Sequence, residues 1–377
     1  MKRLNKLLTA SILAAGSIFL MSCQDVIFEE IRKEVKLEDA QIAGDVRSIV
    51  RYKEASSGKE YIYVQNGNLF KKCTDTKEDA ETLHNWQKVS KPSGSGDIRF
   101  CNKLAADSSY LYAQIVTLKN DTDESEYVPT GTEIWCYDGS EWKIVKINGN
   151  EAHTTGQVVL FCNNAFENSQ RRAYIRYYDT TEKKNLIMKL DGTSAGADMA
   201  LDDAENLSTT PLRTAKACTN YKGTDYFTTG EAITTDSTDT YMYASKNTQL
   251  YFYNGTDWLK SEGNLSAVDI DNSDTIFSLS CSRDYILIGT SGGIKHSMID
   301  TDGKPIYVSS FKSNAQSALS SSYFVYQVLV QDPELPEDEG TLYGTTTFEG
   351  SSSSSSATVE NSGLWAYYKN TKKWNRE

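Results

Sequence analysis

The residues best suited to chemistry in this sequence are seven cysteines and three histidines, and their spacing argues against a metal site. After Cys23 the cysteines are Cys73, Cys101, Cys136, Cys162, Cys218 and Cys281. No two of these six are closer than 26 residues, so none forms the close pair from which zinc sites are built. The histidines, His84, His153 and His296, lie still further apart. We expect no metal and no cofactor, and the sequence leaves open whether the six thiols form disulfides.

Cys23 differs from the other cysteines because of the segment that precedes it. Residues 1–6 carry three cations, and the run from Leu7 to Met21 is uncharged and mostly apolar. About 15 residues are too few for a membrane-spanning helix, which needs roughly 20, and a positive charge on the N-terminal side alone is typical of export signals. We predict that residues 1–22 are a signal peptide.

The end of this segment, Leu20-Met21-Ser22-Cys23, resembles the lipobox of bacterial lipoproteins. In that family the signal is cut before the cysteine, here between Ser22 and Cys23, and the cysteine thiol receives a lipid. Each buried methylene contributes roughly 0.8 kcal/mol, so two or three acyl chains give lasting attachment to a membrane. Gln24 after the cysteine resembles the pattern that is sorted to the outer membrane. The resemblance implies a location in the cell envelope; an ordinary signal peptide with a coincidental cysteine is the alternative.

Residues 289–293, Gly-Thr-Ser-Gly-Gly, fit the Gly-x-Ser-x-Gly pattern of a hydrolase nucleophile. That motif needs a strand leading into a helix, with a histidine base later in the chain. Here a strand pattern follows, and the last histidine, His296, is only a few residues on. We interpret the motif as a hairpin turn and predict no catalytic residues.

Three acidic clusters could be taken for calcium sites. None has the twelve-residue ligand spacing with a closing glutamate, so solvated loop charge is the favoured interpretation. The clusters are Asp121, Asp123, Glu124 and Glu126; Asp269, Asp271 and Asp274; and Asp300 and Asp302.

The charge balance excludes one class of partner. The chain carries 39 basic and 51 acidic residues, a net charge of −12, and loss of the signal peptide would lower it to −15. Binding to nucleic acid depends on clustered lysine and arginine. We therefore expect no nucleic-acid partner, and we expect the lipid on Cys23 to provide the contact with the membrane.

The remaining chain is organised by a repeated β pattern. Short aromatic and β-branched runs, which suit half-buried strands, recur at intervals of 49 to 62 residues. They contain Tyr63, Tyr112, Tyr174, Tyr226, Tyr285 and Tyr343. A second strand pattern follows each run, at residues 68–71, 133–137, 185–188, 249–253, 293–296 and 363–368. Each unit is long enough for four strands, and repeated all-β units of this kind indicate propeller blades.

Four cysteines support this alignment because each precedes the aromatic strand of its unit: Cys101, Cys162, Cys218 and Cys281. The first strand of a propeller blade lines the central channel, so we expect these thiols to be buried near the axis as small apolar fillers. A metal-binding ring is the less favoured alternative. Trp135, Trp142 and Trp258 are expected in the cores of their blades, although exposed rings would suit carbohydrate or protein binding.

Residues 286–294 resemble the blade motif of sensor-type propellers, and the hairpins that end at Trp142, Trp258 and Trp374 are similar to kelch-like blades. We predict an all-β chain in three parts: a signal peptide (1–22), a lipidated tether (23–44) that is a short helix or disordered, and a β-propeller (45–377). Six blades are expected, and seven would also fit.

The sequence favours a non-enzymatic, membrane-anchored binding scaffold for a protein or glycan, although it identifies no ligand-binding residue. Propellers host many unrelated functions, so two alternatives stay open. One is an envelope-assembly lipoprotein that faces the periplasm. The other is a glycan-active enzyme, whose paired carboxylates cannot be selected without geometry.

Overall fold

The structure is a computed structural model. It describes residues 40–92, 98–120, 127–162, 168–198, 217–221, 224–228, 233–235, 242–246, 249–253, 258–260, 276–282, 284–300, 305–311, 324–332, 340–347, 362–368, 370–371 and 373–377. Between residues 217 and 275, Leu250 is the one residue whose side chain is described. The predicted signal peptide, the lipobox with Ser22 and Cys23, and most of the tether lie outside these ranges. No helix within them is long and apolar enough to cross a membrane.

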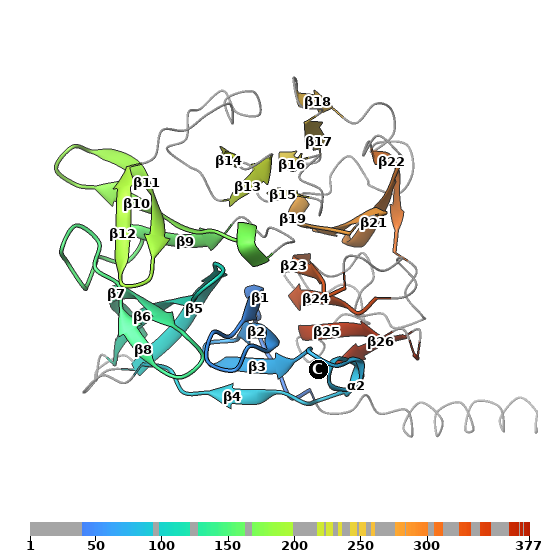
Figure 1. The fold of residues 1–377 in the computed structure, drawn as a ribbon, viewed down its shortest axis with the longest axis horizontal. Coiled ribbons are helices and arrows are strands. Elements are labelled where there is room, and N and C mark those ends of the chain that lie inside the picture. The colour runs from blue at the N-terminus through green and yellow to red at the C-terminus, as the bar shows by residue number, and fades with distance from the viewer. Residues whose placement is uncertain are drawn as a thin grey trace, which may run out of the picture. The chain divides into compact units, whose positions relative to one another are not determined.

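The described strands form six four-stranded sheets and one two-stranded sheet, each from one continuous stretch of chain (Figure 1). Sheet I contains β1 (Ser48–Lys53), β2 (Glu60–Gln65), β3 (Leu69–Cys73) and β4 (Gln87–Val89). Sheet II contains β5 (Ile98–Ala106), β6 (Leu111–Asn120), β7 (Tyr127–Tyr137) and β8 (Trp142–Ile144). Sheet III contains β9 (Val158–Cys162), β10 (Ala173–Asp179), β11 (Lys184–Asp191) and β12 (Ser194–Asp198).

The second half of the chain repeats this arrangement. Sheet IV contains β13 (Ala217–Tyr221) and β14 (Thr224–Thr228). Sheet V contains β15 (Ile233–Thr235), β16 (Met242–Lys246), β17 (Gln249–Tyr253) and β18 (Trp258–Lys260). Sheet VI contains β19 (Ile276–Cys281), β20 (Tyr285–Thr290), β21 (Gly293–Ile299) and β22 (Pro305–Ser310). Sheet VII contains β23 (Phe324–Val330), β24 (Leu342–Thr347), β25 (Gly363–Tyr368) and β26 (Lys373–Arg376).

The first strands of the seven sheets contact one another in a closed cycle. Contacts join β1 to β5, β5 to β9, β9 to β13, β13 to β15, β15 to β19, β19 to β23 and β23 to β1. Sheets that are each built from consecutive strands and that meet through their first strands have a propeller-like arrangement. The prediction of an all-β, propeller-like body is therefore confirmed. Among the described residues the helices are short: α2 (Lys77–Glu81) and a 3₁₀ turn at Asn168–Gln170.

The six tyrosines that defined the repeat all lie in second strands, namely β2, β6, β10, β14, β20 and β24. One part of the predicted repeat is wrong. The Tyr226 strand (β14) and the 249–253 strand (β17) were expected to share a unit, yet they lie in different sheets. Because β15 and β16 lack a strong aromatic run, the sequence pattern did not reveal that a separate sheet begins there.

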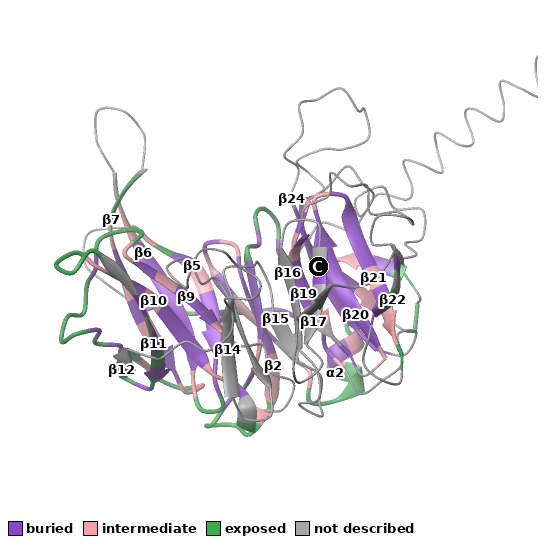
Figure 2. Ribbon diagram, turned by 90° about the horizontal axis from the view of Figure 1, so that it is seen from above, coloured by how far each residue is buried: buried purple, intermediate pink, exposed green. Residues whose placement is uncertain are grey.

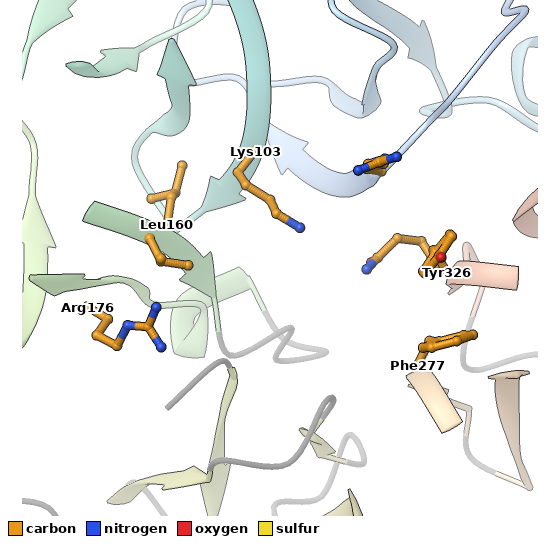
Figure 3. Close-up of a pocket in the computed structure, with 8 residues that line it drawn as sticks. Lys103, Leu160, Arg176, Phe277 and Tyr326 are labelled. Carbon is orange, nitrogen blue, oxygen red and sulfur yellow. The ribbon is translucent and has the colours of Figure 1, made fainter. Parts of the chain in front are cut away.

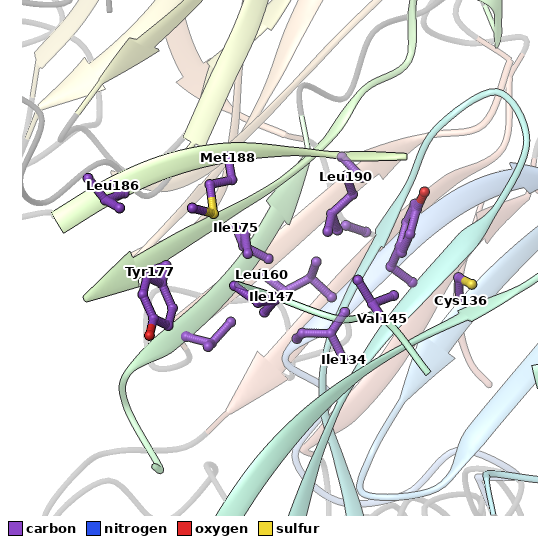
Figure 4. Packing of buried hydrophobic residues seen from close by; sticks show 14 residues of the cluster. Ile134, Cys136, Val145, Ile147, Leu160, Ile175, Tyr177, Leu186, Met188 and Leu190 are labelled. Carbon is purple, nitrogen blue, oxygen red and sulfur yellow. The ribbon is translucent and has the colours of Figure 1, made fainter. Parts of the chain in front are cut away.

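Burial is concentrated in the strands, and the connecting turns are exposed (Figure 2). Neighbouring sheets pack face to face. Between sheets II and III, for example, Ile134 and Val145 meet Leu160, Ile175 and Met188 in one apolar cluster (Figure 4). Since alternate residues of each strand face such a cluster, the intervening residues near the first strands are left to point elsewhere.

The chain ahead of β1 packs against the last strands. Ile42 is fully buried, and its amide donates to the Glu377 carbonyl at 2.8 Å. Ala43 forms an isolated bridge with Gly363. Glu377 is also fully buried, and its carboxylate lies 3.1 Å from Lys72 Nζ of sheet I. These contacts join sheets I and VII, so residues 42 and 43 are part of the folded body.

Candidate functional site

The strongest candidate site is a cavity of about 430 Å³ at the first strands of the sheets. Small-molecule sites commonly have volumes of roughly 300 to 1,000 Å³. The lining residues come from the start of sheet I and from sheets II, III, VI and VII (Figure 3). They are Arg47, Lys103, Val159, Leu160, Arg176, Phe277, Tyr326 and Gln327.

Two aromatic residues reach this cavity because their strands contain β-bulges. In β19 the register with β20 shifts between Ile276 and Ser278, which leaves Phe277 as the extra residue. In β23 the register with β24 shifts between Val325 and Gln327, which leaves Tyr326 as the extra residue. A bulge re-aims a side chain that regular pleating would turn to another face, and bulges are frequent beside functional sites.

The bulged residues form part of a cluster of three rings. The centroids of Phe277 and Tyr326 are 4.7 Å apart with the rings tilted by 38°. Phe324, which precedes Tyr326 in β23, lies 5.7 Å from Phe277. All three rings are only partly buried, so they offer apolar surface at the cavity.

Close packing of sheets VI and VII fixes these rings. A Cβ atom placed on Gly289 of β20 would lie 2.5 Å from the Val325 carbonyl oxygen and 2.5 Å from Ser278 Oγ. Only glycine allows the backbones of β20 and β23 to approach this closely. Gly289 therefore positions both bulges relative to each other.

The remaining polar lining is cationic. Arg47, Lys103 and Arg176 contribute three positive groups, and the described lining includes no carboxylate. Arg47 pairs with Asp45 at 2.9 Å, which offsets part of its charge. Burial lowers the pKa of Arg176 below its usual value, but the ordinary arginine pKa is so high that the guanidinium stays charged.

The predicted hairpin at residues 289–293 is confirmed. β20 ends at Thr290 and β21 begins at Gly293, which pairs directly with Thr290. Thr290 Oγ1 donates to the Gly293 carbonyl at 2.8 Å and accepts from the Gly292 amide at 3.0 Å. The serine of this motif therefore lies in a strand-to-strand turn, which is not the geometry of a hydrolase nucleophile.

The repeated cysteines lie in first strands, as predicted: Cys101 in β5, Cys162 in β9, Cys218 in β13 and Cys281 in β19. Cys101 is fully buried and Cys162 partly buried; the side chains of the other two are not described. Burial raises the pKa of the Cys101 thiol to about 12, so it is protonated and a poor nucleophile at neutral pH. Cys73, Cys101, Cys136 and Cys162 are free thiols.

Other predicted features lie partly outside the described residues. Of the acidic clusters, only Asp300 is described, and it is exposed. Trp135 and Trp142 are half-buried against the core of sheet II, with Trp142 stacked on Tyr137. The side chain of Trp258 is not described. Within the described part of the chain, no group of three or more His, Cys, Asp or Glu residues could hold a metal ion.

Sequence reasoning missed every residue that lines the cavity. The cations Arg47, Lys103 and Arg176 are ordinary charges in a chain that has many. A local signal existed for the aromatic residues, since Ile276-Phe277 and Val325-Tyr326 interrupt the strict alternation of a half-buried strand. Nothing in the sequence, however, shows that two such interruptions meet.

The comparisons with known proteins agree with an all-β repeat fold at low similarity. Sqt1 from Saccharomyces cerevisiae is 9% identical, with a TM-score of 0.40 over 86% of this chain and 96% of Sqt1. The SapL1 lectin, solved with alpha methyl fucoside, is 14% identical, with a TM-score of 0.39 over 89% and 95% of the two chains. An extracellular domain of a putative hybrid two component system from B. thetaiotaomicron is 11% identical, with a TM-score of 0.37 over 85% of this chain and 38% of that one.

No protein-family model matches the sequence, and no curated protein is significantly similar to it. Because the TM-scores of these three structures are 0.40 or lower, the description of the fold depends on the sheet order and on the contacts between first strands.

Proposed function

We propose that this protein is a non-enzymatic, lipid-anchored binding scaffold of the bacterial cell envelope that holds its ligand in the cavity at the first strands. The observation that carries the proposal is the lining of that cavity. It combines cations and partly exposed aromatic rings from five sheets, a composition that suits the orientation and binding of a ligand.

The lining also supports a binding role over a catalytic one. The described lining residues include no carboxylate, histidine, cysteine, serine or threonine. General acid–base or nucleophilic catalysis needs such groups within hydrogen-bond reach of the reacting atoms. Measured turnover of any substrate by the purified protein would contradict this part of the proposal.

We further propose that the body is a propeller of seven blades, with β13 and β14 as the described strands of the fourth blade. The cycle of contacts between first strands supports this count, because sheet IV takes its own place between sheets III and V. The six blades favoured by sequence spacing would require sheets IV and V to be one blade, and they share no ladder.

The location is supported by the sequence alone. The basic head, the apolar run and the lipobox ending at Cys23 support lipid attachment, and Gln24 supports sorting to the outer membrane. A protein or glycan outside the cytoplasm would then be the partner. Orientation decides between a surface role and the alternative role of an assembly factor that faces the periplasm.

The test combines lipid labelling with protease accessibility in cells. Wild-type protein should incorporate labelled fatty acid and stay in the membrane fraction, whereas Cys23→Ala should do neither. Cys73→Ala is the matched control, since Cys73 lies in the folded body and should not affect labelling. Labelling that persists in Cys23→Ala would refute the anchor.

Protease treatment of intact and lysed cells then reports orientation. Cleavage on intact cells would support display at the surface and a ligand from the environment. Protection until lysis would favour a periplasmic partner and the assembly role.

A further inference from the structure

The cavity is divided into a cationic side and an aromatic side. Lys103 and Arg176 extend from sheets II and III, whereas Phe277 and Tyr326 extend from sheets VI and VII, across the cavity from them (Figure 3). A ligand that fills the space would therefore meet charge at one end and flat apolar surface at the other.

Arg176 is the most informative of the cations. It lies in β10, where its neighbours Ile175 and Tyr177 face the core shared with sheet II. The side chain of Arg176 consequently projects from the opposite face. Its guanidinium is half-buried, and the described part of the chain provides it with no hydrogen bond or ion pair. A half-buried charge without a protein partner is costly unless a ligand or water compensates it.

The charge of the cavity contrasts with that of the whole chain. The protein has a net charge of −12, yet the described lining of the cavity holds three cations and no carboxylate. A concave site with walls of low dielectric constant concentrates its local potential. The cavity therefore favours anions, and the planar fork of an arginine is suited to bidentate binding of carboxylate or sulfate oxygens.

The aromatic side narrows the class of anion. One face of a sugar ring presents mainly C–H groups, which pack against aromatic rings, while its hydroxyl groups remain available for hydrogen bonds. Phe277 and Tyr326 provide such rings, and Gln327 next to Tyr326 provides an amide that can donate and accept. A free phosphate or a simple carboxylate would use the cations and leave the aromatic surface uncovered.

We propose that the cavity binds an acidic sugar, with its carboxylate or sulfate at Arg176 and Lys103 and its ring against Phe277 and Tyr326. This inference rests on the proposed role as a binding scaffold and assigns the ligand class to the same cavity. An acidic peptide would satisfy the cations as well, but it has no feature that accounts for two bulges that aim aromatic rings at the cavity.

The experiment is a glycan array that displays uronic-acid, sulfated, sialylated and neutral glycans, with a polyglutamate peptide as a further probe. Full-length protein in detergent should bind acidic glycans and leave neutral ones. Separate uronic-acid and sulfated spots show which anionic group is used. Affinity for the best acidic glycan is then measured by calorimetry.

Two variants test the assigned residues. Arg176→Gln should weaken binding by about tenfold or more, because it removes a charge-assisted hydrogen bond. Tyr326→Ala should weaken it by a similar factor. The matched controls are Lys189→Gln and Tyr178→Ala, two exposed residues of sheet III, which should bind as wild type. Thermal unfolding of each variant verifies that it is folded.

Several results would overturn the inference while leaving the scaffold role standing. Binding confined to neutral glycans, or acidic-glycan binding that Arg176→Gln does not change, would refute the assigned class or site. Binding of polyglutamate without any glycan would replace the acidic sugar by an acidic peptide. Failure of lipid labelling at Cys23, by contrast, would refute the anchor and not the ligand.

Discussion

Tyr112 and Tyr343 occupy equivalent positions in the second strands β6 and β24, and both are fully buried. Their hydroxyl groups differ. Tyr112 donates to Asp107 Oδ2 at 2.8 Å and accepts from the Gly192 amide at 2.9 Å. The Tyr343 hydroxyl has no hydrogen-bond partner in the described part of the chain. The repeat therefore conserves the buried ring between these two sheets, while the hydroxyl contributes in only one of them.

This difference predicts opposite outcomes for the same substitution. Tyr112→Phe should lower the free energy of unfolding by about 1–3 kcal/mol, because Asp107 and the Gly192 amide lose a buried partner. Tyr343→Phe should leave stability unchanged or raise it slightly, since it removes an unpaired buried hydroxyl. Urea denaturation of the two variants makes the comparison. Equal losses in both would show that the Tyr112 hydrogen bonds contribute nothing beyond the ring.

At the level of elements, the informative contact is that between sheets VI and VII. Two glycines lie in second strands there, Gly289 in β20 and Gly344 in β24. A Cβ on Gly289 would meet the backbone oxygen of Val325, whereas a Cβ on Gly344 would meet the end of the Ile294 side chain at 2.7 Å. A side-chain terminus can move more easily than a strand, so the two sites should tolerate alanine differently.

We expect Gly289→Ala to destabilise the protein by about 1–3 kcal/mol, the usual range for overpacking, and to weaken ligand binding because β23 and Tyr326 must shift. Gly344→Ala should cost less and leave binding intact. Thermal unfolding and glycan calorimetry measure the two effects. Normal binding by a folded Gly289→Ala variant would show that the spacing of β20 and β23 does not position the rings.

At the scale of the whole molecule, each described sheet is one continuous stretch of chain, so the contact between sheets I and VII cannot depend on a shared strand. Buried polar groups join them instead. Lys72 Nζ lies 3.1 Å from Glu377 Oε1 and also contacts the Tyr368 hydroxyl. Glu377 Oε2 accepts from Trp86 Nε1 at 2.7 Å and from the His84 amide at 3.1 Å. Burial lowers the pKa of Lys72, and the nearby Glu377 carboxylate opposes that shift.

Breaking this pair should destabilise the protein strongly. Lys72→Met alone should cost about 3–5 kcal/mol, because it leaves Glu377 as a buried charge without its cation. The double variant Lys72→Met with Glu377→Gln should recover part of that loss, since neither charge remains and the new side-chain amide oxygen can still accept from Trp86. Denaturant unfolding of both variants and of Glu377→Gln completes the cycle. Additive losses would indicate that the pair is not coupled.

The strand pattern and the identity of the repeat follow from local chemistry, which the sequence contains. Aromatic second strands, the turn at Gly289 to Gly293 and the first-strand cysteines could be predicted because side-chain alternation and turn preference act over a few residues. The division between sheets IV and V could not, since strand pairing depends on which partner is available in space. Ser22 and Cys23 lie outside the described residues, so the lipid site remains a prediction.

What the sequence alone determined is therefore an all-β repeat with an export signal and a candidate lipid attachment site at Cys23. The tertiary structure decided where a ligand could bind. Arg176 and Tyr326 are 150 residues apart and lie in strands whose own patterns give no reason to associate them. They line one cavity because the first strands of the sheets meet in a cycle and because a bulge turns Tyr326 toward it. Such a site arises from packing between distant segments, and no local pattern encodes it.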